Sequence, residues 1–142
     1  MRMNIGLLCF ITHRAMETRV MAALAAAGFD DLTLAQGRVA ARISPGGTRL
    51  TALAEQAQVT KQTAGFLVDQ LERAGYVRRE PDPADARARL VRMAPRGEAA
   101  VAVARAAEAE VEKEWTGHLG PGEIERLRAA LESLRELTDP YR

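Results

Sequence analysis

Cysteine and histidine are almost absent from this 142-residue chain, which has one cysteine and two histidines. Cys9 has no second cysteine to pair with, so nothing in the sequence requires an oxidising compartment. His13 and His118 are far apart and lack acidic or thiolate neighbours at metal-ligand spacing. We therefore expect no metal site and no cofactor.

Long apolar runs are also missing. The apolar stretch from Ile5 to Ile11 is far shorter than the ~20 residues that a membrane helix needs. His13, Arg14 and Glu17 follow it before any cleavage site, which argues against a secretory signal. We expect a cytoplasmic protein. The sequence has no nucleophile-base pair, carboxylate dyad or phosphate-binding glycine loop, so we do not expect an enzyme.

The net charge of +1 hides an uneven distribution. Residues 73–97 hold seven arginines and three acids, whereas residues 98–142 hold six bases and ten acids. A local basic block on a neutral scaffold is typical of a surface that binds a polyanion. Five of the arginines lie in or just before "EPDPADARARLVRMAPRG", around a turn-rich tip built from two prolines and two aspartates: Arg79, Arg87, Arg89, Arg92 and Arg96.

Most of the chain has helical periodicity. A first helix over about residues 4–27 begins apolar nearly all round, which indicates coverage by a partner subunit. Thr33 is expected to cap a short helix that ends at Ile43. Two further helices close the chain from about 95 to 138, and the last has an apolar seam formed by Ile124, Leu127, Leu131 and Leu134.

Residues 50–74 predict a helix-turn-helix. Thr51 is expected to cap the first helix, and Thr60 the second, which runs from about Lys61 to Ala74 and stops at Gly75. The second helix has an inward stripe of Ala64, Leu67, Val68 and Leu71. Its outward face carries Gln62, Phe66, Asp69 and Arg73, with Lys61, Thr63 and Gly65 at the edges. Such a helix makes base contacts from its first turn, and we expect Phe66 either to touch a thymine methyl or to rest on the neighbouring hairpin.

A β-hairpin wing is predicted directly after this helix, with strands "YVRRE" and "ARLVRM" joined by "PDPADA". A hairpin beside a helix in the major groove can lay arginines along the phosphates and insert one into the minor groove. The Asp85 carboxylate is expected to hold the nearby Arg87 guanidinium in an extended pose. Arg89 and Arg92 are expected to meet phosphates or to cover the hairpin stem.

The run "LTALAEQAQVTKQTAGFLVDQLERAGYVRREPDPADARARLVRMAPRG" resembles the winged helix-turn-helix of the MarR family of bacterial transcription regulators, including its D-x-R wing motif at Asp85 and Arg87. The resemblance implies a mainly α fold with a small β-wing. It also implies one chain in which residues 1–32 and 98–142 are dimerisation helices and residues 33–97 bind DNA.

The resemblance further implies a homodimeric repressor that grips a pseudo-palindromic double-stranded operator and is released by a small aromatic or anionic effector. Arg87 would enter the minor groove, and Asp85 would brace the wing. The DNA-binding set expected from pattern and resemblance together is Thr51, Thr60, Lys61, Gln62, Thr63, Phe66, Arg73, Asp85, Arg87 and Arg89.

Four candidate residues concern the signal to which such a regulator responds. Gly37 stands where the family often has an aromatic residue that lines the ligand cleft, so the resemblance implies a larger pocket or another route of control. His13 with Arg14 could bind a ligand carboxylate, although an ordinary solvated helix face is the alternative. Cys9 resembles the sensing thiol of some family members, but its apolar neighbours favour a buried structural cysteine. Two other functions stay open: a redox-responsive regulator that uses Cys9, and a winged-helix protein-interaction module without operator binding.

Overall fold

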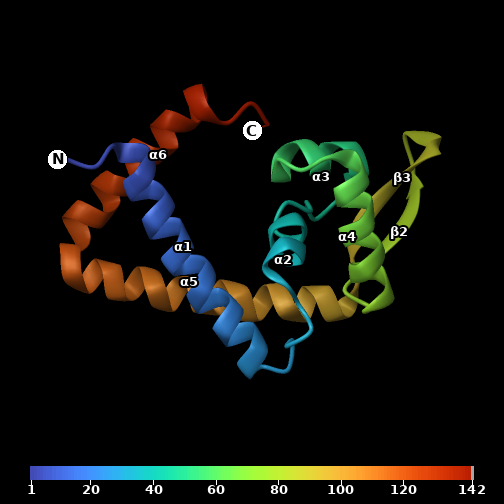
Figure 1. Ribbon diagram of the computed structural model, residues 1–142, viewed down its shortest axis with the longest axis horizontal. Helices are drawn as coiled ribbons and strands as arrows, with labels where there is room; N and C mark the ends of the chain where they lie inside the picture. Colours follow the sequence, from blue (N-terminus) through green and yellow to red (C-terminus); the bar gives the residue numbers. More distant parts are fainter. Residues whose placement is uncertain (142) are drawn as a thin grey trace. The chain divides into compact units, whose positions relative to one another are not determined.

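The computed structural model describes residues 1–141, which form six helices and three strands and divide into two compact units. One unit combines residues 1–23 with the segment from Ala104 onward, and the other spans Leu24–Val103. The elements, in chain order, are α1 (Ile5–Ala26), α2 (Leu34–Ala40), β1 (Thr48–Arg49), α3 (Leu50–Ala57), α4 (Lys61–Arg73), β2 (Val77–Asp82), β3 (Asp85–Met93), α5 (Pro95–Leu119) and α6 (Pro121–Thr138) (Figure 1). The mainly α fold with a small β-wing is confirmed.

Ion pairs link the three helices of the first unit. Arg19 of α1 forms a bidentate pair with Glu114 of α5, at 2.7 and 3.0 Å. Arg128 of α6 donates to Glu112 of α5 at 2.9 Å. Gly120, with φ of 88°, separates α5 from α6 and is followed by proline at the first turn, where its missing N–H costs nothing.

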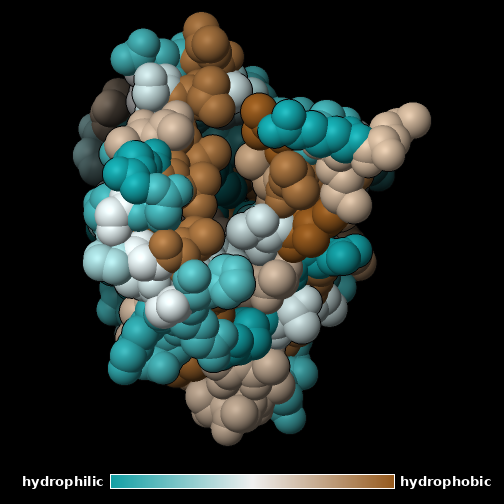
Figure 2. Space-filling model, turned by 90° about the vertical axis from the view of Figure 1, so that its left-hand side faces the viewer, coloured by the Kyte–Doolittle hydropathy of each residue, from teal (hydrophilic) through white to brown (hydrophobic). Residues whose placement is uncertain are grey.

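Large apolar side chains remain on the surface of this unit. They lie on the first turns of α1 and along α6, and they are Ile5, Leu7, Leu8, Phe10, Leu127, Leu131, Leu134 and Leu137, each at least 41% exposed. Figure 2 shows hydrophobic atoms gathered in a strip between hydrophilic ones on one face of the molecule. In the predicted seam of α6, only Ile124 is buried. Among the described residues, no helix is long and apolar enough to span a bilayer.

The second unit has its core where α2, α3, α4 and the sheet meet. All four inward residues predicted for α4 are buried, as are Leu53 and Val39. Thr33 caps α2 as expected, and Gln36 completes a capping box that the sequence analysis did not predict. The predicted end of α2 at Ile43 is wrong, because Arg42 and Ile43 bond to the carbonyls of Val39 and Ala40 in tighter i to i−3 turns.

The helix-turn-helix differs from the prediction at its first cap. Arg49, at the end of β1, precedes α3 without a side-chain cap, so Thr51 is already inside the helix and the expected Thr51 cap is wrong. Gln58 ends α3 in the left-handed conformation, with φ of 56°. Thr60 does cap α4, because its hydroxyl accepts from the Thr63 amide at 3.0 Å.

The wing is part of a three-stranded antiparallel sheet in the order β1-β3-β2. The two-residue strand β1, which the sequence did not predict, pairs Thr48 with Val91. Strands β2 and β3 continue to an Asp82–Asp85 pair, so the turn is shorter than the predicted "PDPADA". Pro81 is tolerated within β2 because this strand lies at the edge of the sheet, where an N–H can be missing.

Helix α5 begins tightly against the start of β2. The Ala94 amide donates to the Tyr76 carbonyl at 2.9 Å. A Cβ added at Gly97 would collide with that same carbonyl oxygen and would lie 2.8 Å from the sulfur of Met93. Only glycine therefore fits at this point without a shift of the backbone.

Candidate nucleic-acid interface

Helix α4 exposes its outward side chains together. Thr60, Lys61, Gln62, Thr63, Phe66 and Arg73 are all exposed. The Thr60 hydroxyl is already committed to the cap and also contacts the Thr63 hydroxyl at 2.9 Å. Within residues 1–141, no ion pair involves Lys61 or Arg73. Both cations are therefore available to an external anion.

Arg79 fixes the wing to α4. Its guanidinium donates to Asp69 at 2.8 Å and to Glu72 at 2.9 Å, and its backbone amide donates to Glu72 at 3.2 Å. Asp69 is therefore not an open polar group of the outward face, as the helical wheel suggested. These ion pairs were missed in the sequence analysis. A usable signal was present, because two acids on the helix lie close in sequence to an arginine on the next strand.

Other arginines hold the base and the tip of the hairpin. Arg92 forms an ion pair with Glu80, at 2.6 Å, and donates to the Gly46 carbonyl at 3.0 Å. Arg92 was expected either to meet phosphates or to cover the hairpin stem, and these contacts support the second role. Arg49 on β1 pairs with Asp82 at 2.8 Å. The Ala84 amide and then Arg49 hold the pKa of Asp82 below its usual value, so this carboxylate stays ionised at neutral pH.

Arg87 and Arg89 are the wing arginines that point to solvent. Both are exposed, and within the described part of the chain neither guanidinium has a hydrogen bond or ion pair. Asp85 accepts from the Arg87 backbone amide at 3.0 Å and not from the guanidinium, so the expected side-chain clasp is wrong. Asp85 begins β3 beside a tight turn, where an aspartate bonds the amide two residues on. It fixes the backbone and leaves the Arg87 side chain open.

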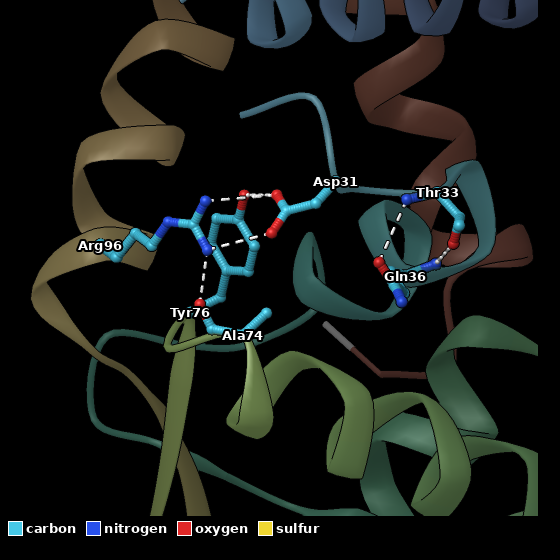
Figure 3. Close-up of polar contacts among 6 residues, drawn as sticks. All are labelled: Asp31, Thr33, Gln36, Ala74, Tyr76 and Arg96. Carbon is cyan, nitrogen blue, oxygen red and sulfur yellow. Dashed lines mark hydrogen bonds and ion pairs between the residues drawn. The ribbon is translucent and has the colours of Figure 1, made fainter. Parts of the chain in front are cut away.

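Arg96 does not belong to the wing at all (Figure 3). Its guanidinium carbon lies 4.2 Å from the centroid of the Tyr76 ring, and it donates to Asp31 at 3.1 Å and to the Ala74 carbonyl. The Tyr76 hydroxyl also donates to Asp31. This Arg96 cluster, defined as Asp31, Ala74, Tyr76 and Arg96, joins the loop before α2, the end of α4 and the starts of β2 and α5.

Burial and hydrogen bonding set the protonation of this cluster. Burial first, and the bond to Asp31 second, raise the pKa of Tyr76 to about 12. The Tyr76 hydroxyl and then Arg96 lower the pKa of Asp31. The phenol is thus neutral and the carboxylate charged at neutral pH, which is the combination that the three side chains need to bond one another.

The candidate ligand residues have nearby partners or lie in different units. His13 is 3.3 Å from Glu17 one turn along α1, and Arg14 lies over Phe10, 5.8 Å from the ring centroid. Gly37 lies on α2, in the other unit. Neither finding tests a ligand role for these residues, which stays a prediction.

Cys9 is exposed, so the expected burial of this cysteine within the chain is wrong. Its neighbours Leu8 and Phe10 are about half exposed, at 48% and 53%. Across residues 1–141, no group of three histidine, cysteine or acidic side chains could hold a metal ion.

Comparison with known proteins shows what this geometry is similar to. Residues 30–88, which contain α2, the helix-turn-helix and most of the wing, match the model of the MarR family. This segment is similar to the winged helix-turn-helix of the MarR family. The transcriptional regulator HosA of Escherichia coli O111:H- is 39% identical over 79 residues, which are 56% of this chain and 58% of HosA. The matched region therefore spans less than two thirds of the length of the curated relatives that this chain resembles.

Solved structures extend the likeness over the whole fold. The transcriptional regulator Tm0710 of Thermotoga maritima is 26% identical, with a TM-score of 0.63 over 95% of this chain and 91% of that one. A mutant of S. aureus MepR bound to an oligodeoxyribonucleotide has 20% identity and a TM-score of 0.60, over 97% and 100% of the two chains. CouR of Rhodococcus jostii RHA1, bound to p-coumaroyl-CoA, has 21% identity and a TM-score of 0.72, over 98% and 94%. Tm0710 and HosA are both named as transcriptional regulators, and neither name describes an enzyme.

Proposed function

We propose that this MarR-family protein is a homodimeric repressor that binds a pseudo-palindromic operator in double-stranded DNA. The observation that carries the proposal is a set of exposed cations on α4 and the wing that have no partner within residues 1–141, beside a recognition helix with an N-terminal cap: Lys61, Arg73, Arg87 and Arg89. Phosphate contacts from such cations position a protein on a duplex, and base contacts then give specificity.

In this proposal α4 enters the major groove with Gln62 and Thr63 at base edges and Lys61 at a base edge or a phosphate. Arg87 inserts into the minor groove, which attracts arginine where A·T-rich sequence makes it narrow. Arg89 meets phosphate. The ion pairs of Arg79 with α4 and of Arg49 with Asp82 support this arrangement, because they fix the wing relative to the recognition helix before DNA arrives.

The dimer would form through the apolar surfaces of α1 and α6. Leu127, Leu131 and Leu134 are each about 40% exposed, at 41, 42 and 42%, on one stripe of α6, and Phe10 on α1 is 53% exposed. Solvent-exposed apolar side chains in such a group mark an interaction surface. A second copy of the chain supplies the same groups, so a two-fold interface would cover both sets.

A small aromatic or anionic effector would release this repressor from its operator. The p-coumaroyl-CoA complex of CouR supports the class of ligand, because that molecule is both aromatic and anionic. His13, Arg14 and Gly37 are the residues proposed to contact it. A redox signal through Cys9 is the second candidate, favoured by the exposure of this thiol in the single chain.

Salt-dependent binding to a duplex tests the central proposal. The purified protein is titrated against a fluorescent duplex with a random-sequence core at 50 and 200 mM salt. We expect weaker binding at the higher salt, because neutralising phosphates releases counterions, with a log–log slope of about −0.9 for each phosphate contacted. Absence of any salt-sensitive binding would favour the protein-interaction module instead.

A further inference from the structure

Phe66 is an apolar side chain on an otherwise polar surface. It lies on the outward stripe of α4, one turn after Gln62 and one turn before Asp69, and 58% of its surface is exposed. In the described chain, Phe66 has no aromatic or cation–π partner, and the wing leaves most of the ring uncovered. The ring therefore remains available to a ligand that covers this face.

The charge around Phe66 indicates what that ligand is. Lys61 and Arg73 flank it at the two ends of α4 without ion pairs inside the described residues, and this arrangement complements a polyanion. The inference rests on the proposed function, because it assumes that α4 lies in the major groove of a duplex. The helical rise puts Phe66 about 6 Å along the axis from Gln62, so both side chains reach the same groove.

We propose that Phe66 recognises the C5 methyl group of a pyrimidine in the operator. The major groove presents hydrogen-bonding groups at every base pair, and its apolar feature is the methyl group of thymine, which 5-methylcytosine shares. A phenyl ring cannot satisfy the polar groups, but it can cover this methyl. Operator binding therefore depends on thymine at one position in each half-site, and cytosine methylation at that position strengthens binding relative to cytosine.

Deoxyuridine isolates the methyl group, because it differs from thymidine by that group alone. Burying one methyl group contributes a factor of about four in affinity. A dimer that makes the contact in both half-sites should therefore lose about 15-fold when both thymines are replaced by deoxyuridine. Phe66→Ala should bind the two duplexes equally, and Phe66→Leu, which keeps an apolar side chain, should retain most of the preference.

The experiment needs no known operator. The full-length protein selects a duplex from a pool with a randomised core of about 20 base pairs, a length that spans two half-sites one helical turn apart. The selected duplex is then made with thymidine, and with deoxyuridine at each symmetry-related pair of thymines in turn. At the sensitive pair it is also made with cytosine and with 5-methylcytosine. Every duplex is titrated against wild type, Phe66→Ala and Phe66→Leu. Leu34→Ala is the matched control, because it removes another exposed apolar side chain from α2, and it should keep the wild-type preference.

The outcomes separate this inference from the proposed function. Equal affinity of wild type for the thymidine duplex and for every deoxyuridine duplex would overturn the inference and leave operator binding intact. The inference would also be overturned if Phe66→Ala bound more weakly but kept the preference for thymidine over deoxyuridine, since the ring would then contact sugar. Failure of wild type to select any duplex would overturn both. The supporting result is that wild type binds the duplex with 5-methylcytosine at the sensitive position more tightly than the duplex with cytosine there. Phe66→Ala should show no such difference.

Discussion

Arg96 stacks on Tyr76 while both side chains bond to Asp31, so one arginine from the start of α5 closes a cluster that joins four segments of the second unit. The Tyr76 ring is 2% exposed, whereas Arg96 and Asp31 are partly open to water. The planar guanidinium suits this position because it can stack and donate in two directions at once.

Arg96→Lys should therefore destabilise the protein although it keeps the charge. Lysine cannot stack as a plane or donate to Asp31 and the Ala74 carbonyl together, and we expect a loss of about 1–3 kcal/mol in the free energy of unfolding. Urea denaturation measures the loss. Arg126→Lys is the matched control: Arg126 pairs with Glu123 on the surface of α6, and such pairs contribute at most about 1 kcal/mol. Equal stability of the two variants would contradict a structural role for the cluster.

The Tyr76 hydroxyl should make stability depend on alkaline pH. Its pKa is about 12 in the folded protein and near 10 in an unfolded chain, so folding favours the neutral phenol. The resulting stabilisation is fully present below pH 10 and is lost as the pH rises towards 12. The stability difference between wild type and Tyr76→Phe should shrink over this range. Unfolding measured at pH 8, 10 and 11 checks the sign, and a difference that grows with pH would contradict it.

The wing arginines should separate into binding and structural groups. Arg87→Ala should weaken binding to the selected duplex by about 1–3 kcal/mol and reduce the salt slope, while the melting temperature stays unchanged. Arg92→Ala should lower the melting temperature, because it leaves Glu80 and the Gly46 carbonyl without their partner. Both variants remove one positive charge. Identical effects on DNA binding would therefore mean that the place of the arginine on the wing does not matter for binding.

The two threonines of the helix-turn-helix should also differ. Thr60→Ala removes the cap of α4 and should cost about 1 kcal/mol of stability. Thr51→Ala removes an exposed side chain from inside α3, where alanine is the better helix former, and should cost nothing. Thermal denaturation of both variants decides whether the cap assignment is right.

The apolar stripe of α6 should control the oligomeric state. Wild type should sediment at about 31 kDa, twice the 15.5 kDa chain, because covering this stripe and the start of α1 needs a second copy. Leu131→Glu should shift the equilibrium towards monomer, whereas Ala129→Glu, on the opposite side of α6, should not. A wild-type protein that is folded and monomeric at micromolar concentration would contradict the dimer.

The sequence predicted the elements that have strong local signals. The inward stripe of α4, its Thr60 cap and the Gly75 stop depend on spacing and backbone chemistry within one helix, and all three were correct. The α5–α6 pair was correct for the same reason. The expected Thr51 cap was wrong because the two-residue strand β1 ends at Arg49 and α3 begins at the next residue. So short a strand leaves no periodic pattern in the sequence.

Long-range partners were less predictable than helices. The basic block was found from composition, but composition does not say which arginines have acids within reach after folding. Arg79 and Arg96 turned out to hold segments together, because Asp69, Glu72 and Asp31 come from other elements. Arg96 and Asp31 are far apart in the sequence, so no local pattern predicts their ion pair. The DNA and effector roles themselves stay predictions that the binding experiments address.

The close approach at Gly97 has a mechanical consequence. Because no side chain fits between this residue and the Tyr76 carbonyl, the first turn of α5 lies against β2 in a single packed arrangement. Rolling that turn about its axis would drive neighbouring side chains into the carbonyl and detach the Ala94 amide from it. The first turn of α5 and the root of the wing must therefore turn as one piece, and any bending of this long helix falls on residues farther along it.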